Sequence, residues 1–432
     1  MVATREQLDR LQAQGLADLL AAILPSHAFY ARKLADFSPS RLSFPRDLAR
    51  LPFTTREELL AAQRQFPPHG GLITYPFERY TRMHQTSGTS SGVPLRWYDT
   101  PESWQGLLDG WIEKFAFGGI TARDVLFFPF SFGPFIGFWS AFEAGLKLGC
   151  RCLPGGGMSS SARLRFLLAN EATVVFCTPT YGLRLLEVAH QEGIDLVSSS
   201  VRALIVAGEP GGSIPTTRQR LETGWGARVF DHNGMTETGP LGFETLESPA
   251  SLTLLETAIW PEVVDAAGNP VPPGTPGELV VTSFRRVASP LIRYRTGDVV
   301  CVDPDPDPAG RPMMRLKQGI TGRVDDMIVV RGNNLHPTAI QAILHGIEGI
   351  AEWVVEIDQQ GPLTELCVRV EPAAGVDAAS LVARVDRTLR DRLLFRIAVE
   401  AAAPGSLPRS EMKSRRWLRR DSKASRSTEP IN

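Results

Sequence analysis

The sequence predicts an α/β protein. We expect a large N-terminal domain, with parallel sheets flanked by helices and a small β-rich subdomain, followed by a small α+β C-terminal domain. Three observations predict this arrangement: apolar runs alternate with helical patterns from about residue 125, runs broken by Pro and Gly fill 265–317, and a compact pattern of strands and helices follows residue 322. The chain has 432 residues, 43% hydrophobic and 22% charged, which is enough for two or three folding units.

The alternating region predicts a parallel sheet covered on both faces. Apolar runs such as VLFFPF (125–130) and TVVFCTP (173–179) lack the polar alternation of a half-exposed strand, and a helical pattern follows each. The further expected strands are CRCL (150–153), VRALIVAGEP (201–210) and ARVFDHNG (227–234). The expected helices are WSAFEAGLKLG (139–149), ARLRFLLAN (162–170), YGLRLLEVAHQEG (181–193) and TTRQRLETGWG (216–226).

The later part of the chain predicts a change of architecture. Frequent Pro and Gly at 265–317 indicate hairpins of a mostly antiparallel subdomain, with DPDPDPAG (303–310) as a solvated loop. After it, the order strand, helix, strand, helix predicts the small α+β domain. We therefore predict domains at 1–321 and 322–421, and a disordered tail at 422–432.

Composition excludes several classes of protein. Lys plus Arg (46) balances Asp plus Glu (47), so the chain as a whole offers no footprint for nucleic acid, although 409–426 is basic. Five cysteines, an odd number, favour a reducing compartment, and we expect a cytoplasmic location. Cys150 and Cys152 fit strand packing better than a metal site. The charged N-terminus is unlike a signal peptide, and no uncharged apolar run reaches membrane-spanning length.

The stretch HQTSGTSSGVPLRWY (84–98) carries a run of small and hydroxylated residues that suits phosphate oxygens. Its glycines allow close approach of the backbone, and turned backbone N–H groups form a concavity that binds anions. The spacing does not match a Walker A loop, which would need G-x-x-x-x-G-K-[ST]. A flexible surface linker is the alternative interpretation of this stretch taken alone.

Three further segments favour a nucleotide site. DHNGMTETG (231–239) ends an expected strand, where α/β sheets place their ligands, and its Glu237 suits Mg²⁺ on a phosphate. YRTGD (294–298) ends in an aspartate that can accept hydrogen bonds from ribose hydroxyls, and GRVDD (322–326) puts one arginine and two acids at the expected domain joint. Each segment alone fits a turn or a surface ion pair equally well.

In this order the motifs resemble the adenylate-forming superfamily of acyl-CoA synthetases, adenylation domains and luciferases. The branch that the chain resembles most is that of the phenylacetate-CoA ligases. The resemblance runs from LPFTTREEL (51–59) to GSLPRSEMKSRR (405–416). It implies an AMP-forming acid–thiol ligase that uses ATP and Mg²⁺ to make an acyl-adenylate and then transfers the acyl group to coenzyme A. It also allows a homodimer, since dimers are common in this branch.

The resemblance implies a role for each matching position. The phosphate loop would comprise Thr86, Ser87, Gly88, Thr89 and Gly92. The adenine wall would comprise Gly208, Glu209, Pro210, Asp231, Asn233 and Gly234. Thr236 and Glu237 would contact the α-phosphate and Mg²⁺, Asp298 would bind the ribose, and Arg323 would be a second contact to the ribose or a phosphate. Asp325 would be the hinge of a mobile C-terminal domain, and Lys413 would act catalytically in adenylation.

The sequence also departs from the family pattern at three places. The phosphate loop has an extra serine, and Val93 stands where Lys is common, which removes one positive charge near the leaving pyrophosphate. Met412 precedes Lys413 where glycine is usual. His336 occupies a position that is more often aromatic or aliphatic.

The segment FFPFSFGPFIGFWSAF (127–142) predicts the acyl pocket, because it holds seven of the 21 phenylalanines. Ligand pockets are mostly apolar, so we expect an aryl or other hydrophobic carboxylic acid there. The predicted lining residues are Phe132, Gly133, Phe135, Ile136, Gly239 and Pro240. Some of the rings fit the core equally well. Transfer to an amine, a carrier protein or another nucleophile, or a non-catalytic nucleotide sensor, are the alternative functions.

Overall fold

The structure is a computed structural model. It describes residues 4–37, 47–86, 93–324, 328–330, 333–335, 337–358, 364–393, 395–409, 416–420 and 428–431. Seven residues singled out in the sequence lie outside the described ranges: Ser87, Gly88, Thr89, Gly92, Asp325, His336 and Lys413.

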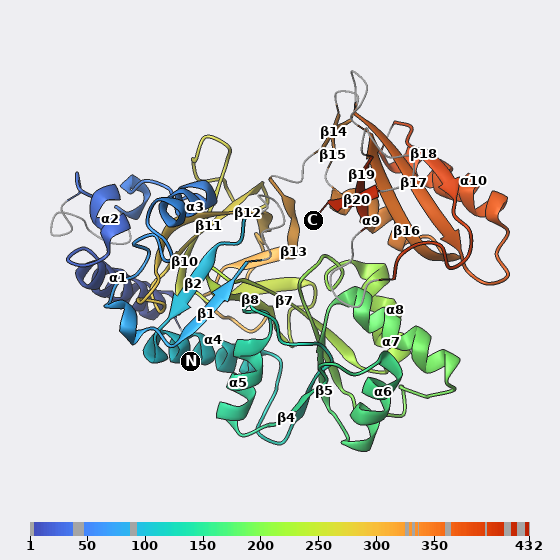
Figure 1. Cartoon of the computed structure of the whole chain (residues 1–432), viewed down its shortest axis with the longest axis horizontal. Helices are drawn as coiled ribbons and strands as arrows, with labels where there is room; N and C mark the ends of the chain where they lie inside the picture. The colour runs from blue at the N-terminus through green and yellow to red at the C-terminus, as the bar shows by residue number, and fades with distance from the viewer. Residues whose placement is uncertain are drawn as a thin grey trace.

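Most strands of the described chain join one sheet of eleven strands, in the order β10-β11-β12-β13-β9-β8-β7-β6-β5-β3-β4 (Figure 1). The parallel half consists of β3 (Val125–Phe128), β4 (Arg151–Pro154), β5 (Val174–Cys177), β6 (Ala203–Val206) and β7 (Arg228–Met235). The antiparallel half consists of β8 (Gly239–Glu244), β9 (Ser251–Leu254), β10 (Ile259–Val264), β11 (Pro276–Ser283), β12 (Leu291–Val302) and β13 (Arg315–Arg323). The predicted β-rich segment thus continues the parallel sheet.

Helices cover both faces of the parallel half, as the apolar runs predict. In β5, Val174 and Phe176 join one hydrophobic cluster, whereas Val175 and Cys177 join another. The first cluster includes residues of α4 (Pro101–Phe117) and α5 (Trp139–Leu148), and the second includes residues of α6 (Ser160–Ala169), α7 (Pro179–Gln191) and α8 (Pro215–Trp225). Because successive strand residues face opposite sides, a strand buried on both sides shows no polar alternation.

The N-terminal segment packs on the antiparallel half of the sheet. It contains α1 (Arg5–Ile23), α2 (Ala28–Lys33), α3 (Arg56–Gln65), the 3-10 turns η2 (Leu48–Arg50) and η3 (Phe77–Arg79), and the hairpin of β1 (Arg82–Gln85) and β2 (Arg96–Asp99). Its apolar side chains share a hydrophobic cluster with Leu291, Ile292 and Tyr294 of β12. The three helices lie together in blue at the left of Figure 1.

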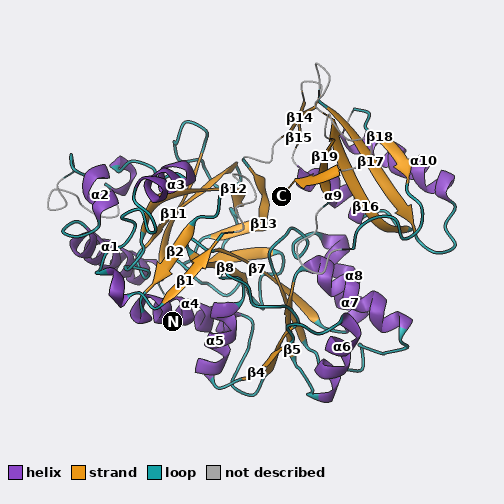
Figure 2. Ribbon diagram, viewed as in Figure 1, coloured by secondary structure: helices purple, strands orange, loops and turns teal. Residues whose placement is uncertain are grey.

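The C-terminal region forms a separate small α+β unit, drawn in orange and red in Figure 1 and by secondary structure in Figure 2. Its elements are β14 (Ile328–Val330), β15 (Asn333–Leu335), α9 (Pro337–His345), β16 (Ile350–Asp358), β17 (Glu365–Pro372), α10 (Ala378–Leu393), β18 (Ala398–Ala401), β19 (Trp417–Arg420) and β20 (Thr428–Ile431). Its main sheet has the order β18-β17-β16-β19-β20. At the end of the segment predicted to be a disordered tail, Thr428–Ile431 form β20, which pairs antiparallel with β19.

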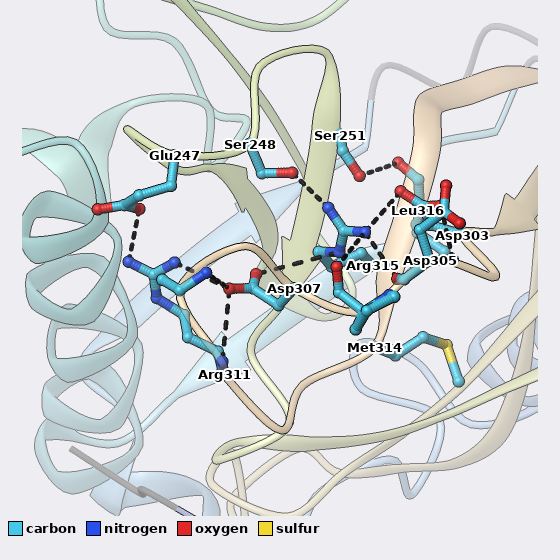
Figure 3. A network of polar contacts seen from close by, with 12 residues as sticks. Glu247, Ser248, Ser251, Asp303, Asp305, Asp307, Arg311, Met314, Arg315 and Leu316 are labelled. Carbon is cyan, nitrogen blue, oxygen red and sulfur yellow. Dashed lines mark hydrogen bonds and ion pairs between the residues drawn. The ribbon is translucent and has the colours of Figure 1, made fainter.

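The acidic loop between β12 and β13 is more ordered than its composition predicts. Asp307 lies between two arginines, with Arg311 Nη1 3.3 Å from its Oδ1 and Arg315 Nε 4.0 Å from its Oδ2 (Figure 3). Arg315 also pairs with Asp303 at 2.8 Å. The prediction of a solvated loop is therefore wrong for Asp303 and Asp307, whose carboxylates neutralise arginines.

The described part of the chain can be examined for disulfides and for membrane-spanning helices, neither of which the sequence predicts. All five cysteines fall within it, and none of them forms a disulfide. Among the described residues, none of the helices combines the length and the apolar character that a membrane span needs.

Candidate active site

Arg56, Thr86 and Glu237 come together at the edge of the sheet from three distant parts of the chain. Arg56 Nη1 donates to Glu237 Oε1 at 3.1 Å, and its Nη2 donates to Thr86 Oγ1 at 3.1 Å. Thr86 is the first residue of the predicted phosphate loop and the only one that the structure describes, and Glu237 follows β7. The predicted phosphate and magnesium positions therefore share one guanidinium.

Local structure explains why Arg56 points into this site. Thr55 caps α3, with Glu58 N donating to Thr55 Oγ1 and Thr55 N donating to Glu58 Oε2, so Arg56 is the first helical residue. Thr54 joins the chain to β12, since its N–H donates to Arg293 O and its carbonyl accepts from Arg295 N, both at 2.9 Å. A cation is disfavoured at the positive end of a helix, so the site is poised for an anion.

Arg56 was not among the residues predicted for the site. Its segment, TTREEL, was interpreted only as typical of the phenylacetate-CoA ligase branch. The capping pattern T-x-x-E would have placed Arg56 at the helix start, although not its partners 30 and 181 positions away. Arg56 Nε is buried and has no hydrogen-bond partner in the structure, which leaves a donor for a ligand.

Glu237 is buried, with 5% of its surface exposed. The Tyr294 hydroxyl lies 3.4 Å from Glu237 Oε1. Burial raises the pKa of Tyr294 well above its ordinary value, and the neighbouring Glu237 charge adds to the shift. Tyr294 therefore stays protonated and donates to the carboxylate.

A buried ion pair fixes the backbone of the Thr236–Glu237 segment. Arg286 Nε donates to Asp99 Oδ1 at 2.7 Å, and Arg286 Nη2 donates to Asp99 Oδ2 at 2.5 Å. The third nitrogen, Nη1, donates to the carbonyls of Thr236 at 2.6 Å and Glu237 at 3.0 Å. Because both side chains are almost completely buried, the guanidinium holds this turn in one position.

The predicted adenine wall is assembled from two neighbouring strands. β6 pairs with β7 in parallel, with Val206 opposite Asp231, so residues 208–210 and 231–234 leave the same edge of the sheet. Gly208 has φ +92°, a left-handed conformation that favours glycine. A Cβ on Gly234 would lie 2.7 Å from Gly239 O, so the backbone needs glycine there. The Glu209 carboxylate accepts from Thr180 N at 2.8 Å and thus caps α7.

Asn233 has the features of a ligand-binding side chain. Both polar atoms of its amide are buried without a hydrogen-bond partner in the structure, and buried polar atoms are normally satisfied. Its carbonyl accepts from Lys114 Nζ at 2.9 Å. Complete burial lowers the pKa of Lys114 well below its ordinary value. Lys114 was missed by sequence analysis, because a lysine in the apolar helix pattern of α4 gives no sign of its partner.

Asp231 and the predicted ribose residues have partners within the protein. Ser213 Oγ donates to Asp231 Oδ2 at 2.5 Å, while burial raises the pKa of Asp231 to about 6. Asp298 and Arg323 lie opposite each other on β12 and β13, with Arg323 Nη1 2.8 Å from Asp298 Oδ1. The structure therefore brings the two predicted ribose contacts together as one pair.

The aromatic segment lies beside the phosphate-loop entrance. Gln85 N donates to Pro134 O at 2.8 Å, one residue before Thr86. The Phe132 ring packs on Trp139 with centroids 4.5 Å apart, and Phe135 lies over Gly133 and Gly137. Phe127, Phe128, Ile136 and Phe138 are buried in the core. Gly239 and Pro240 pack against Leu107 and Gly110 of α4.

The residues fit a magnesium ion that is shared with a nucleotide. No cluster of three His, Cys, Asp or Glu that could hold a metal occurs among the described residues. Mg²⁺ usually takes one or two carboxylates together with substrate phosphates, so it needs no such cluster. Glu237 supplies one carboxylate beside Thr86, where the phosphates are expected.

Comparison with known proteins confirms the predicted resemblance. The family model described as AMP-binding enzyme matches residues 107–285, and the model of the AMP-binding enzyme C-terminal domain matches residues 332–420. Phenylacetate-coenzyme A ligase of Aromatoleum evansii is 32% identical over 348 residues, covering 78% of this chain and 76% of the relative. The ligase of the same name from Thermus thermophilus is 28% identical and covers 94% and 95% of the two chains.

Solved structures of 2-hydroxyisobutyryl-CoA ligase are 29% identical to the chain. In the postadenylation state with an acyl-AMP, that enzyme superposes with a TM-score of 0.89, covering 95% of this chain and 89% of its own. In the thioesterification state with acyl-AMP and CoA the TM-score is 0.72, with 96% and 90% covered. Since both are states of one protein, the domains of this chain are arranged more like those of the postadenylation state.

Proposed function

The chain belongs to the AMP-binding enzyme family of adenylate-forming ligases, and we propose that it is an AMP-forming acid–thiol ligase. It activates a carboxylic acid with ATP and passes the acyl group to coenzyme A. The observation that carries this proposal is the meeting of Thr86, Arg56 and Glu237, which unites the expected phosphate and magnesium positions. The curated phenylacetate-coenzyme A ligases and the acyl-CoA ligase structures support it over most of the chain.

The reaction has two steps. A carboxylate oxygen of the acid attacks the α-phosphorus of ATP, and the bond to the bridging oxygen breaks to release pyrophosphate. The thiol of coenzyme A then attacks the acyl carbon, a proton is lost from sulfur, and AMP leaves. Neither step needs a nucleophile from the protein, so its contribution is position and charge.

The charged groups of the candidate site have distinct tasks in this reaction. Arg56 and the Thr86 hydroxyl face the triphosphate, and Arg286 holds the Thr236–Glu237 turn in place. Mg²⁺ bound to Glu237 and the phosphates would supply further positive charge. Arg56 also supplies a positive charge near the phosphate loop, where this chain has Val93 in place of the lysine that is common in the family.

The remaining site residues are part of the proposal. Thr86, Ser87, Gly88, Thr89 and Gly92 cradle the phosphates, and Lys413 stabilises the charge that develops in adenylation. Asn233, with its unpartnered amide, binds the base beside the 208–210 segment. Asp298 and Arg323 bind the ribose, and Asp325 is the hinge between units at 1–321 and 322–421.

We further propose an aryl or other hydrophobic acid as the substrate. The supporting observation is the cluster of Phe132, Phe135 and Trp139 beside the phosphate-loop entrance. A cytoplasmic location fits the free cysteines, and a homodimer is expected from the branch.

A screen of acids tests the proposal. Purified protein is incubated with ATP, Mg²⁺ and arylacetates, benzoates or cinnamates while pyrophosphate release is measured. Coenzyme A is then added, and the thioester is sought by mass spectrometry. Acid-dependent release followed by a thioester is expected. Pyrophosphate release without thioester formation would indicate that the acceptor is an amine or a carrier protein. Absence of acid-dependent pyrophosphate release would overturn the proposal.

A further inference from the structure

The helix α9 of the C-terminal unit contacts the large domain through one face. Gln341 and His345 are four residues apart, so they lie on the same side of the helix. Gln341 Nε2 donates to the carbonyl of Pro210 at 3.1 Å, and only 7% of Gln341 is exposed. His345 Nδ1 lies 2.6 Å from Thr217 Oγ1 on α8. In Figure 1, α9 lies next to α8.

Both contacts reach elements that matter for nucleotide binding. Pro210 ends the 208–210 segment of the proposed adenine wall. Thr217 belongs to α8, which begins five residues after Pro210 and packs on β7. A third hydrogen bond of α9 to the large domain runs from Thr338 Oγ1 to Thr321 O of β13, at 2.7 Å. Among the described residues, α9 thus contacts the large domain through neutral hydrogen bonds.

His345 also contacts Arg416, which follows Lys413 in the sequence. Arg416 Nη1 lies 3.4 Å from His345 Nε2, and Arg416 Nε donates to Glu352 Oε1 at 2.7 Å. An arginine only donates, so His345 Nε2 accepts and Nδ1 carries the proton toward Thr217. Burial lowers the pKa of His345 to about 3, which keeps the ring neutral in this bridge.

These contacts belong to one arrangement of the two units. The chain is more similar to the postadenylation state of its structural relative than to the thioesterification state, so α9 is docked in the arrangement associated with the first half-reaction. A docking contact made in one arrangement and lost in another biases the equilibrium between them by its own free energy.

We propose that Gln341 and His345 are positioning residues that hold the C-terminal unit in its adenylation arrangement. They dock α9 on Pro210 and Thr217, and His345 also contacts Arg416. The inference rests on the proposed ligase function and deepens it, because it assigns an arrangement-specific role to residues that touch neither substrate. It requires that weakening the contacts impairs adenylation and spares thioester formation.

The test compares the two half-reactions in Thr217→Val and Gln341→Leu, which remove one partner of each contact from opposite units. Phenylacetate is the probe acid, or another acid that the screen finds active. Adenylation is followed by acid-dependent exchange of pyrophosphate into ATP, and thioester formation by mixing supplied acyl-adenylate with coenzyme A. A neutral hydrogen bond contributes about 0.5–1.5 kcal/mol, so exchange should fall roughly two- to tenfold in each variant. Thioester formation should stay unchanged or become faster.

Two controls separate this role from general damage. Thr388→Val removes a hydroxyl of the same kind, whose Oγ1 donates only within α10 to Arg384 O, and both rates should be unchanged. Combining Thr217→Val with His345→Phe should cost little more than either alone, because both remove the same contact.

The possible results separate failure of the docking role from failure of the proposed ligase function. Equal loss of both half-reactions, or no change in either, would overturn the inference while the wild-type enzyme stays active. Absence of exchange by the wild-type chain with every acid would instead remove the proposed function, and the docking role with it.

Discussion

Arg56 Nη1 lies 3.1 Å from Glu237 Oε1, so the first residue of α3 is paired with the carboxylate proposed to hold magnesium. The same guanidinium reaches Thr86, next to the proposed phosphate loop. Nucleotide and Mg²⁺ entering the site therefore meet a cation that is already in place, and Arg56 is free to exchange its carboxylate partner for a phosphate.

Replacing Arg56 should impair adenylation more than folding. We expect Arg56→Ala to lower acid-dependent pyrophosphate exchange by ~10²-fold, the typical effect of losing one preorganised charged donor. Arg56→Lys should retain part of the rate, because the charge remains but one of the two contacts is lost. Arg64→Ala, in the exposed last turn of the same helix, is the matched control and should leave exchange unchanged. Equal exchange in Arg56→Ala and Arg64→Ala would refute the role.

The neighbouring residues Arg285 and Arg286 should differ sharply in their effect on stability. Arg286→Met leaves Asp99 buried and unpaired and frees the Thr236 and Glu237 carbonyls, so the free energy of unfolding should fall by about 3–5 kcal/mol. Arg285 pairs with Glu113 where both side chains are 28% exposed, so Arg285→Ala should cost about 1 kcal/mol or less. Urea unfolding measures both. Similar losses would show that the buried pair does not anchor the turn.

The fold was largely predictable because its main signals are local. The two-sided burial of β5 appears in the sequence as an apolar run without alternation, and the flanking helices carry their own periodicity. The pairing of Thr428–Ile431 with β19 could not be predicted, since it depends on the edge of another strand and not on the segment itself. The composition of the loop at 303–310 likewise does not show that Asp303 and Asp307 pair with Arg315 and Arg311.

The site was predictable only where a motif marks it. Thr236 and Glu237 stand out because GMTE is a short continuous pattern. Arg286 does not, because its partner Asp99 is 187 positions away and no local pattern links them. Lys114 is hidden in the same way, since its contacts with His232 and Asn233 exist only once α4 lies on β7. Long-range polar pairs therefore need the structure, whereas the predicted phosphate loop and the GMTE turn are marked by continuous motifs.

Lys413→Ala should separate the two half-reactions. We expect pyrophosphate exchange to fall by at least ~10²–10³-fold, because the proposed ammonium stabilises charge on the α-phosphate during adenylation. Conversion of supplied acyl-adenylate and coenzyme A to thioester should continue. Lys317→Ala, an exposed lysine on β13, is the control for loss of one positive charge. A parallel loss of both half-reactions in Lys413→Ala would contradict the assigned role.

The pairing of Glu371 with Arg409 gives a pH-dependent prediction for the C-terminal unit. Arg409 Nη1 and Nη2 donate to Glu371 at 3.1 and 2.5 Å, and these hydrogen bonds lower the pKa of Glu371 from 4.5 to about 2. A carboxyl group whose pKa is lower in the folded state stabilises the fold above its unfolded pKa. That stabilisation is lost as the pH falls from about 4.5 through 2.

Glu371→Gln should therefore destabilise the unit at neutral pH and matter less in acid. The shift corresponds to at most about 3 kcal/mol, and partial exposure of Arg409 reduces this to about 1–2 kcal/mol at pH 7. The difference from wild type in urea unfolding should shrink by more than half at pH 3, because Glu371 is then mostly protonated in the unfolded chain and must lose that proton to form the ion pair on folding. Glu400→Gln, at an exposed site on the adjacent β18, is the control and should show no such trend. Because Arg409 directly precedes the 410–415 segment, Glu371→Gln should also slow pyrophosphate exchange at pH 7, and an unaltered exchange rate would show that this ion pair does not orient Lys413.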